Sequence, residues 1–148
     1  MAATKIILTS VHGKRLGLDS LGNLIVNGRT VATYDDAGAT KRIQAAPATL
    51  DATGTLTAAQ LLNGLITSTS AAAVSGTLPT GTLLDAAAVI GINEAFEWVV
   101  INTGPNTFTI LVGAAHTIVG NAAVATLTSG RFRSVKTAAN TFITYRVD

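Results

Sequence analysis

The sequence predicts a mainly β protein. We expect an antiparallel β-sandwich or barrel with one or two short helices, preceded by an extended N-terminal arm that contains a β-hairpin. Two observations carry this prediction. From residue 96 onward, short β-prone runs are separated by turn residues at a spacing of about 8–12 residues, which is typical of antiparallel sandwiches and barrels. Near the start of the chain, an Asn-Gly pair separates two further β-prone runs.

The composition combines high hydrophobicity with very few charges. Of the 148 residues, 48% are hydrophobic and 12% are charged, about half of the usual share of roughly 25%. No apolar run approaches the roughly 18 residues that a membrane-spanning helix needs, and disordered chains have the opposite composition. We therefore predict a compact protein with no membrane partner, whose uncharged surface is largely covered by other subunits.

The net charge, the lack of cysteine and the N-terminal residues argue against three further classes: nucleic-acid-binding, thiol-dependent and secreted proteins. A net charge of +2 is too small to indicate nucleic-acid binding. The chain has no cysteine, so disulfides and thiol chemistry are excluded. The first residues lack the apolar core of a signal peptide, and we expect a protein that does not use the general secretion route.

Charge also divides the chain into two parts. Residues 1–51 carry six basic and four acidic groups, whereas residues 52–130 carry only Asp85, Glu94 and Glu97. We predict an N-terminal arm over residues 1–50 and a β-sandwich oligomerisation domain over residues 51–148. The segment 45–48 is the expected linker, because its proline disfavours helix.

The arm contains one clear local signal. Residues 24–26 and 29–31 flank Asn27 and Gly28, and an Asn-Gly pair between β-prone runs is the strongest short hairpin cue. A ribbon this small is only marginally stable alone. We therefore expect the arm to lie on a second surface.

Two short helices are expected at the start of the second part. Thr57 followed by Gln60 forms a capping-box pattern for a helix over residues 57–62, and Gly64 is placed to end it. A second helix is expected over residues 82–88, with a strand over 71–78 between the two.

The remaining strands are expected at residues 96–102, 107–112, 117–119, 124–128, 131–137 and 141–147. Alternation within them assigns two faces. Phe96, Trp98 and Val100 share one face of their strand, and Glu97 points to the other. Threonine is frequent opposite the apolar residues, which keeps a strand soluble without charge and suits contact with another subunit.

Signals for chemistry are weak. His12 and His116 have no nucleophile-elbow pattern beside them, and we expect both to be structural or surface residues. A small hydrolase that uses His116 remains the enzyme alternative. The sequence has no zinc-ligand spacing and no acidic calcium loop, so we predict no metal, no cofactor and no catalytic residue.

The candidate interface residues are mostly basic. One group lies near the C-terminus, another lies in the arm, and Trp98 is added as a buried-strand anchor. Within the C-terminal group, alternation puts Arg131 and Arg133 on one strand face and Lys136 on the other. An anionic protein partner and a solvated edge strand explain the C-terminal group equally well. A sugar-binding platform is the alternative for Trp98. The full set is Arg131, Arg133, Lys136, Arg146, Trp98, Lys14, Arg15 and Arg29.

Residues 55–147 resemble virion proteins of tailed bacteriophages, particularly small head decoration (cement) proteins and head-fibre modules. The resemblance is a pattern of strands and turns rather than a catalytic motif. It is carried by residues 56–66 (LTAAQLLNGLI), 78–81 (LPTG), 96–103 (FEWVVINT), 116–121 (HTIVGN), 129–133 (SGRFR) and 141–146 (TFITYR).

The resemblance implies a homotrimer on the outer surface of the phage head, assembled in the host cytoplasm. It further implies a jelly-roll-like β-domain and an arm that grips the major capsid protein. Such a protein is structural and not an enzyme, and it stabilises the shell. The alternative is a head-fibre or receptor-binding (tail-fibre) module that binds host surface glycans, which would place aromatic side chains at loop tips. The predicted loops are instead rich in Gly, Ala, Asn and Ser.

Overall fold

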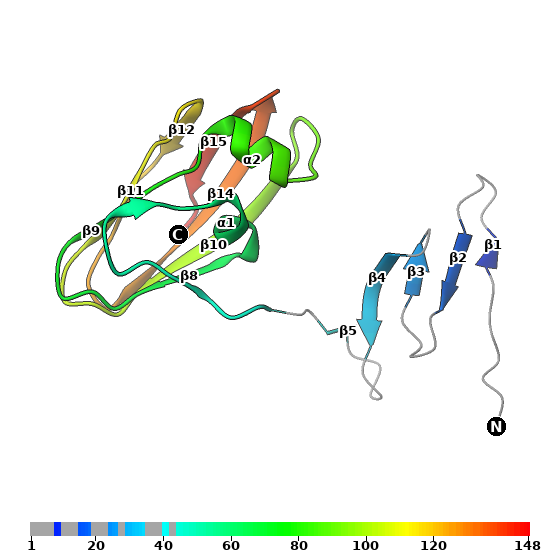
Figure 1. Ribbon diagram of the computed structural model, residues 1–148, viewed down its shortest axis with the longest axis horizontal. Helices are drawn as coiled ribbons and strands as arrows, with labels where there is room; N and C mark the ends of the chain where they lie inside the picture. The colour runs from blue at the N-terminus through cyan, green and yellow to red at the C-terminus, as the bar shows by residue number, and fades with distance from the viewer. Residues whose placement is uncertain (1–7, 10–14, 19–23, 27–28, 35–39, 42–43) are drawn as a thin grey trace. The chain divides into compact units, whose positions relative to one another are not determined.

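The computed structural model describes residues 44–148 in full and residues 8–9, 15–18, 24–26, 29–34 and 40–41 as strand backbone (Figure 1). The chain divides into two compact units, residues 1–44 and 45–148. The described elements of the smaller unit are β-strands, and the larger unit is built mainly from β-strands. The division falls at the start of the expected linker, and residues 45–50 belong to the larger unit rather than to the arm.

The described strands of the smaller unit form a sheet in which each strand pairs with the next along the chain. All of these pairs are antiparallel. Val26 pairs with Arg29, which confirms the predicted hairpin, although Asn27 and Gly28 themselves lie outside the described residues. The strands are β1 (Leu8–Thr9), β2 (Arg15–Leu18), β3 (Leu24–Val26), β4 (Arg29–Tyr34) and β5 (Thr40–Lys41).

The larger unit contains two sheets. The six-stranded sheet has the order β12 (His116–Val119), β15 (Thr141–Arg146), β14 (Thr128–Ala138), β10 (Ala95–Asn102), β8 (Leu65–Ser68) and β6 (Ala48–Thr49). The four-stranded sheet has the order β13 (Ala123–Val124), β11 (Phe108–Leu111), β9 (Val74–Thr77) and β7 (Gly54–Thr55). The arrangement is therefore two sheets and not a closed barrel.

The prediction of purely antiparallel sheets is wrong. From β6 to β11 the chain alternates between the two sheets, and each return adds a strand that runs parallel to an earlier one: β6–β8–β10 in one sheet and β7–β9–β11 in the other. The two returns to the six-stranded sheet carry the helices, and such crossovers produce parallel neighbours. Within the larger unit, antiparallel pairs involve only the C-terminal strands, at β10–β14, β14–β15 and β11–β13. The last pair, β12–β15, is parallel.

Both predicted helices are present. In α1 (Ala58–Asn63), the Gln60 N–H donates to the Thr57 hydroxyl at 3.2 Å, and the Thr57 N–H donates to the Gln60 side-chain oxygen at 2.7 Å. This is the predicted capping box, and Gly64 ends the helix at φ 83°. The second helix is α2 (Gly81–Ala87), capped by the Thr80 hydroxyl.

Most predicted strands of the larger unit were correct within a few residues. Three of its strands were missed: β6 (Ala48–Thr49), β7 (Gly54–Thr55) and β8 (Leu65–Ser68), which follows α1 directly. The strand predicted over residues 124–128 is reduced to β13 (Ala123–Val124). It ends early because Leu127 adopts a left-handed backbone with φ 56°, which a continuing strand does not allow.

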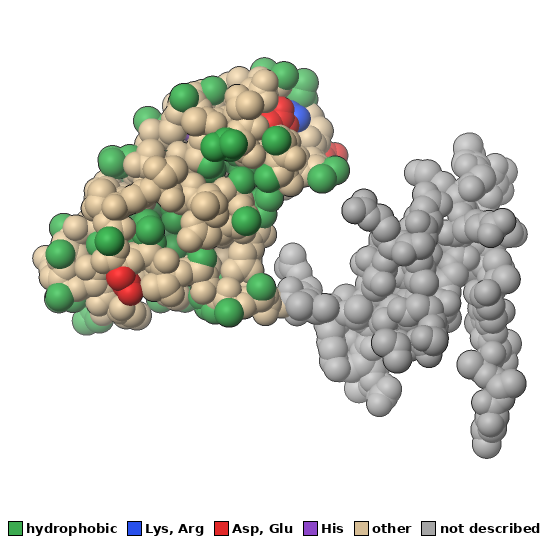
Figure 2. Space-filling view, in the orientation of Figure 1, with side chains coloured by type: hydrophobic (Ala, Val, Ile, Leu, Met, Phe, Trp, Pro, Cys, Tyr) green, Lys and Arg blue, Asp and Glu red, His purple; other side chains and the backbone are tan. Residues whose placement is uncertain are grey.

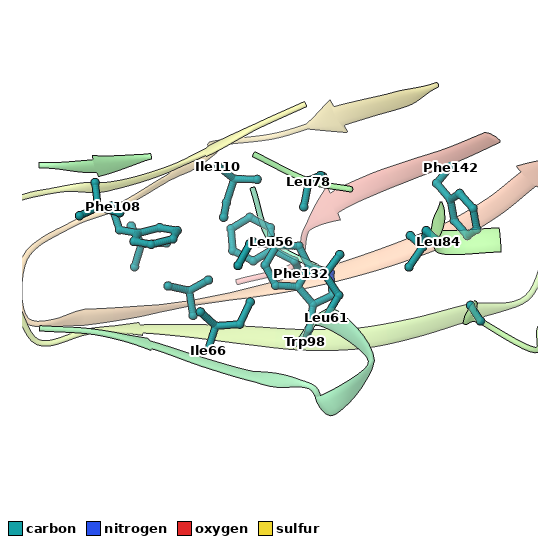
Figure 3. Packing of buried hydrophobic residues seen from close by; sticks show 14 residues of the cluster. Leu56, Leu61, Ile66, Leu78, Leu84, Trp98, Phe108, Ile110, Phe132 and Phe142 are labelled. Atoms are coloured by element: carbon teal, nitrogen blue, oxygen red, sulfur yellow. The ribbon is translucent and has the colours of Figure 1, made fainter. Parts of the chain in front are cut away.

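One hydrophobic core lies between the sheets and the helices (Figure 3). The Trp98 ring stacks on Phe132 with their centroids 4.6 Å apart. Leu61 of α1 and Leu84 of α2 are fully buried in the same cluster, so the helices extend the layer that covers one face of the six-stranded sheet. Figure 3 shows Leu84 beside Phe142 at one end of the cluster and Phe108 at the other.

Candidate interaction surface

The six-stranded sheet has a second face, opposite Trp98 and Phe132, that we call the outer face. Burial alternates along β10, so Trp98 and Val100 point into the core and Val99 and Ile101 point away from it. The outer face of β8, β10, β14 and β15 carries Leu65, Val99, Ile101, Val135, Ile143 and Tyr145, all partly exposed. Its charged side chains on these strands are Glu97, Arg131 and Arg133.

The strand register brings these residues into rows across the sheet. Arg133 lies between Glu97 of β10 and Tyr145 of β15. In the next row, Val99 lies between Arg131 of β14 and Leu65 of β8. The Glu97–Arg133 row therefore divides the apolar residues into two groups. Val135 and Ile143 lie on one side of this row, and Leu65, Val99 and Ile101 lie on the other.

Glu97 and Arg133 form the ion pair of the outer face. The Arg133 Nε donates to Glu97 Oε1 at 3.0 Å, and this hydrogen bond lowers the pKa of Glu97. Both side chains are about half exposed, so the pair contributes little to stability. Its effect is to neutralise the centre of the face.

The C-terminal basic residues lie on two sides of the sheet, as predicted for Lys136. Arg131 and Arg133 lie on the outer face, whereas Lys136 and Arg146 occupy alternate positions directed to the other side. The Lys136 Nζ pairs with Asp85 and donates to the Ile90 carbonyl at 3.2 Å. Its hydrogen bond lowers the pKa of Asp85.

Arg146 is held from several directions. Its guanidinium lies 5.1 Å from the centroid of the Phe132 ring, donates to the Ala123 carbonyl at 3.1 Å and pairs with Asp148. Desolvation raises the pKa of Asp148, but hydrogen bonds from the Arg131 N–H and from Arg146 bring this pKa below its usual value. Arg146 therefore connects β15 to β13, to β14 and to the C-terminal residue.

Trp98 is a core residue. Its side chain is 0% exposed, so the ring offers no platform to a sugar. The indole Nε1 donates to the Ser134 hydroxyl at 3.0 Å, and Ser134 in turn lies 2.9 Å from the Thr144 hydroxyl. Sequence reasoning missed this buried polar chain, although Ser134 and Thr144 stand at inward positions of their strands.

The predicted interface residues of the smaller unit are only partly located. Arg15 begins β2 and Arg29 begins β4, and the structure gives their backbone alone. Lys14 lies outside the described residues. The structure therefore assigns no contact to these three side chains.

His116 is buried at the start of β12. Its side chain lies beside Phe142, with ring centroids 5.5 Å apart. Neither ring nitrogen has a hydrogen-bond partner among the described residues, and desolvation lowers its pKa from 6.5. In a Ser-His-Asp arrangement the imidazole is hydrogen-bonded to a hydroxyl and to a carboxylate, and no described residue makes either bond to His116.

His116 is expected to make the fold sensitive to mild acid. Because its pKa is lower in the folded than in the unfolded state, the unfolded state binds more protons below about pH 6.5. The free energy of unfolding should therefore fall as the pH drops from 6.5 towards 5.5. His116→Leu should be at least as stable as the wild type at pH 7 and should lose this slope, as measured by urea denaturation across that range.

His12 is present in both the wild type and His116→Leu, so its contribution to the pH dependence of stability cancels in this comparison. Asp85, Glu97 and Asp148 have pKa values lowered from 3.8, 4.5 and 3.8, and they lose their stabilising contribution only at more acidic pH. Equal slopes in the two proteins between pH 6.5 and 5.5 would show that His116 is not the sensitive group.

A shallow open hollow of about 420 Å³ lies at one end of β10. Leu127 borders it and is 77% exposed. None of its lining residues is ionisable or aromatic, so it lacks the groups that hold a charged ligand or stack on a sugar. The lining residues are Ile101, Asn102, Thr103, Leu127, Thr128 and Ser129.

Charged side chains are few on the face of the larger unit shown in Figure 2. Within the described residues, no cluster of three or more His, Asp and Glu side chains is placed to hold a metal ion. In that same part of the chain, every helix is too short or too polar to cross a membrane.

Comparison with known proteins adds no relative. The chain matches no model of a known protein family, no curated protein and no solved structure. Function is therefore inferred from the residues themselves and from their arrangement.

Proposed function

We propose that this chain is a virion structural protein: a decoration, or cement, protein that binds the outside of a tailed-bacteriophage head as a homotrimer and stabilises the shell. The observation that carries the proposal is the outer face. It carries six partly exposed apolar side chains and three charged ones, two of which form an ion pair, on a chain in which only 12% of residues are charged. Surfaces of this kind are usually covered by other subunits.

The segments that carry the resemblance to phage head proteins form much of the larger unit. Residues 56–66 contain α1 and the start of β8, residues 96–103 contain β10, and residues 129–133 and 141–146 belong to β14 and β15. These are the strands whose outer face is apolar. The proposal includes a jelly-roll-like fold for the larger unit. The parallel strand pairs described above would be a variation on that fold.

The two units would have different roles in this function. The larger unit has its own hydrophobic core and suits the role of the trimeric body. The smaller unit would act as the arm that grips the major capsid protein, with Lys14, Arg15 and Arg29 as its candidate contacts. A trimer offers three such arms, and several weak contacts acting together give high avidity.

The proposed mechanism is mechanical. Packaged DNA pushes the shell outward, and a trimer that bridges neighbouring capsid subunits adds buried area across the seams between them. No substrate, cofactor or catalytic residue is involved. The proposed location is the outer surface of the virion, after assembly in the host cytoplasm.

Binding to shells tests this function. We expect the full chain to cosediment with expanded shells assembled from the major capsid protein of its own phage, and to bind unexpanded shells much more weakly. Decorated shells should withstand a higher temperature than undecorated ones before they lose their shape in electron micrographs. Absence of cosedimentation would contradict the proposal, and equal heat resistance would remove the cement role.

A further inference from the structure

The outer face is apolar at positions where a solvent-facing sheet is usually polar. A sheet with one face on the core and one in water alternates between apolar and polar residues. Along β10 the alternation fails, because Val99 and Ile101 are apolar although they point away from the core. Val135, Ile143 and Tyr145 repeat this on the two neighbouring strands.

The outer face is also large enough to form a contact. Neighbouring strands lie about 4.8 Å apart, so six strands span about 24 Å, and the six residue steps from Ser129 to Val135 cover about 20 Å. The resulting projected area is on the order of 500 Å². This area includes polar and charged positions as well as apolar ones, and it is somewhat below the roughly 800 Å² that each partner buries in a standard interface.

The charges of the outer face favour a partner with the same character. Glu97 is paired with Arg133, which leaves the Arg131 side chain as the remaining charge of the outer face on β8, β10, β14 and β15. One positive charge gives a strongly acidic or basic partner little complementary field. A second copy of this chain has the same low charge, and identical copies are the commonest partners of soluble oligomers.

We infer that the outer face of the six-stranded sheet is the surface through which copies of this chain contact one another. This inference rests on the self-association within the proposed function and assigns it to named residues. Val99 and Val135 lie on the two central strands of the contact. Glu97 and Arg133 lie between them, where each can also pair with the opposite charge of a neighbouring copy.

The first test introduces positive charge at the centre of the outer face. Val99→Lys combined with Val135→Lys should reduce the solution mass from that of the assembly to 15.0 kDa, measured by light scattering coupled to size exclusion. The matched control is Leu83→Lys combined with Val89→Lys. Leu83 of α2 is 60% exposed, and Val89 in the loop after α2 is 95% exposed. The control should keep the wild-type mass.

The second test does not depend on how well the lysine variant folds. Because the native chain has no cysteine, Val99→Cys introduces a single thiol. That thiol should react with a maleimide at least ten times more slowly in the assembly than after dilution to single chains. Val89→Cys is the control and should react rapidly at both concentrations.

The outcomes separate this inference from the proposed function. An oligomeric wild type whose Val99→Cys thiol reacts freely would overturn the assignment of the outer face and leave self-association intact. A wild type of 15.0 kDa at every concentration would overturn both. If that single chain nevertheless protects the Val99→Cys thiol, the occupant of the outer face is residues 1–44 of the same chain and not a second copy.

Discussion

Replacing Trp98 with alanine is expected to lower the free energy of unfolding by about 3–5 kcal/mol. The side chain is 0% exposed, stacks on Phe132 with centroids 4.6 Å apart and donates its indole N–H to Ser134. Alanine would leave a cavity between β10 and β14 and remove the donor. Urea denaturation followed by circular dichroism measures the loss, because Trp98 is the only tryptophan and its fluorescence disappears with it.

Trp98→Phe is the matched control. It keeps the stacked ring and most of the volume but removes the hydrogen bond to Ser134, and a loss of about 1–2 kcal/mol is expected. If Trp98→Ala costs less than Trp98→Phe, the ring is not an organising part of the core.

Replacing Asn102 with alanine is expected to cost about 2–4 kcal/mol. Asn102 is 2% exposed at the end of β10. Its Nδ2 donates to the carbonyls of Asn106, Val124 and Ala125 at 2.8–3.1 Å, and its Oδ1 accepts the Gly104 N–H at 3.1 Å. Alanine removes every one of these bonds and leaves several backbone groups at the turn and at β13 without their partner.

The control for Asn102 is Asn121→Ala. Asn121 is exposed and accepts one hydrogen bond, from the Ala123 N–H at 2.9 Å, so a loss below about 1 kcal/mol is expected. Thermal melts of the two variants provide the comparison. Equal melting temperatures would mean that the Asn102 network does not hold the end of the sandwich together.

Features of the fold that depend on neighbouring residues were predictable from the sequence. The capping box of Thr57 and Gln60, the glycine stop at Gly64 and the turn between β3 and β4 are set by interactions over a few residues. The hydrogen bonds of α1 and the pairing of Val26 with Arg29 agree with them. Strand positions followed from alternation and turn residues for the same reason.

Strand partners were not predictable, because pairing is decided by contacts far apart in the chain. Ala48 pairs with Ile66, and Ile66 pairs with Val100, so one parallel ladder joins three distant segments. Regular turn spacing suggested hairpins, yet several of the turns carry the chain from one sheet to the other. The strand β8 was missed since its short run follows α1 without the expected loop.

The sequence contains a pattern that indicates the candidate surface. Residues 98–101 are Trp, Val, Val and Ile, so both faces of this strand are apolar, which is typical of a strand covered on both sides. Alternation within residues 131–137 puts Lys136 on the opposite face from Arg131 and Arg133, and β14 confirms this prediction. Arg146 of β15 also lies on the opposite side from Arg131 and Arg133.

The most direct test of the account is the solution mass of the full chain, measured by light scattering coupled to size exclusion over a hundredfold range of concentration. A homotrimer should have a mass of about 45 kDa, three times the 15.0 kDa of one chain. That result would support an oligomeric structural protein and justify the shell-binding experiment. A mass of 15.0 kDa throughout the range would contradict the central claim, because the apolar outer face would then have no second copy to cover it.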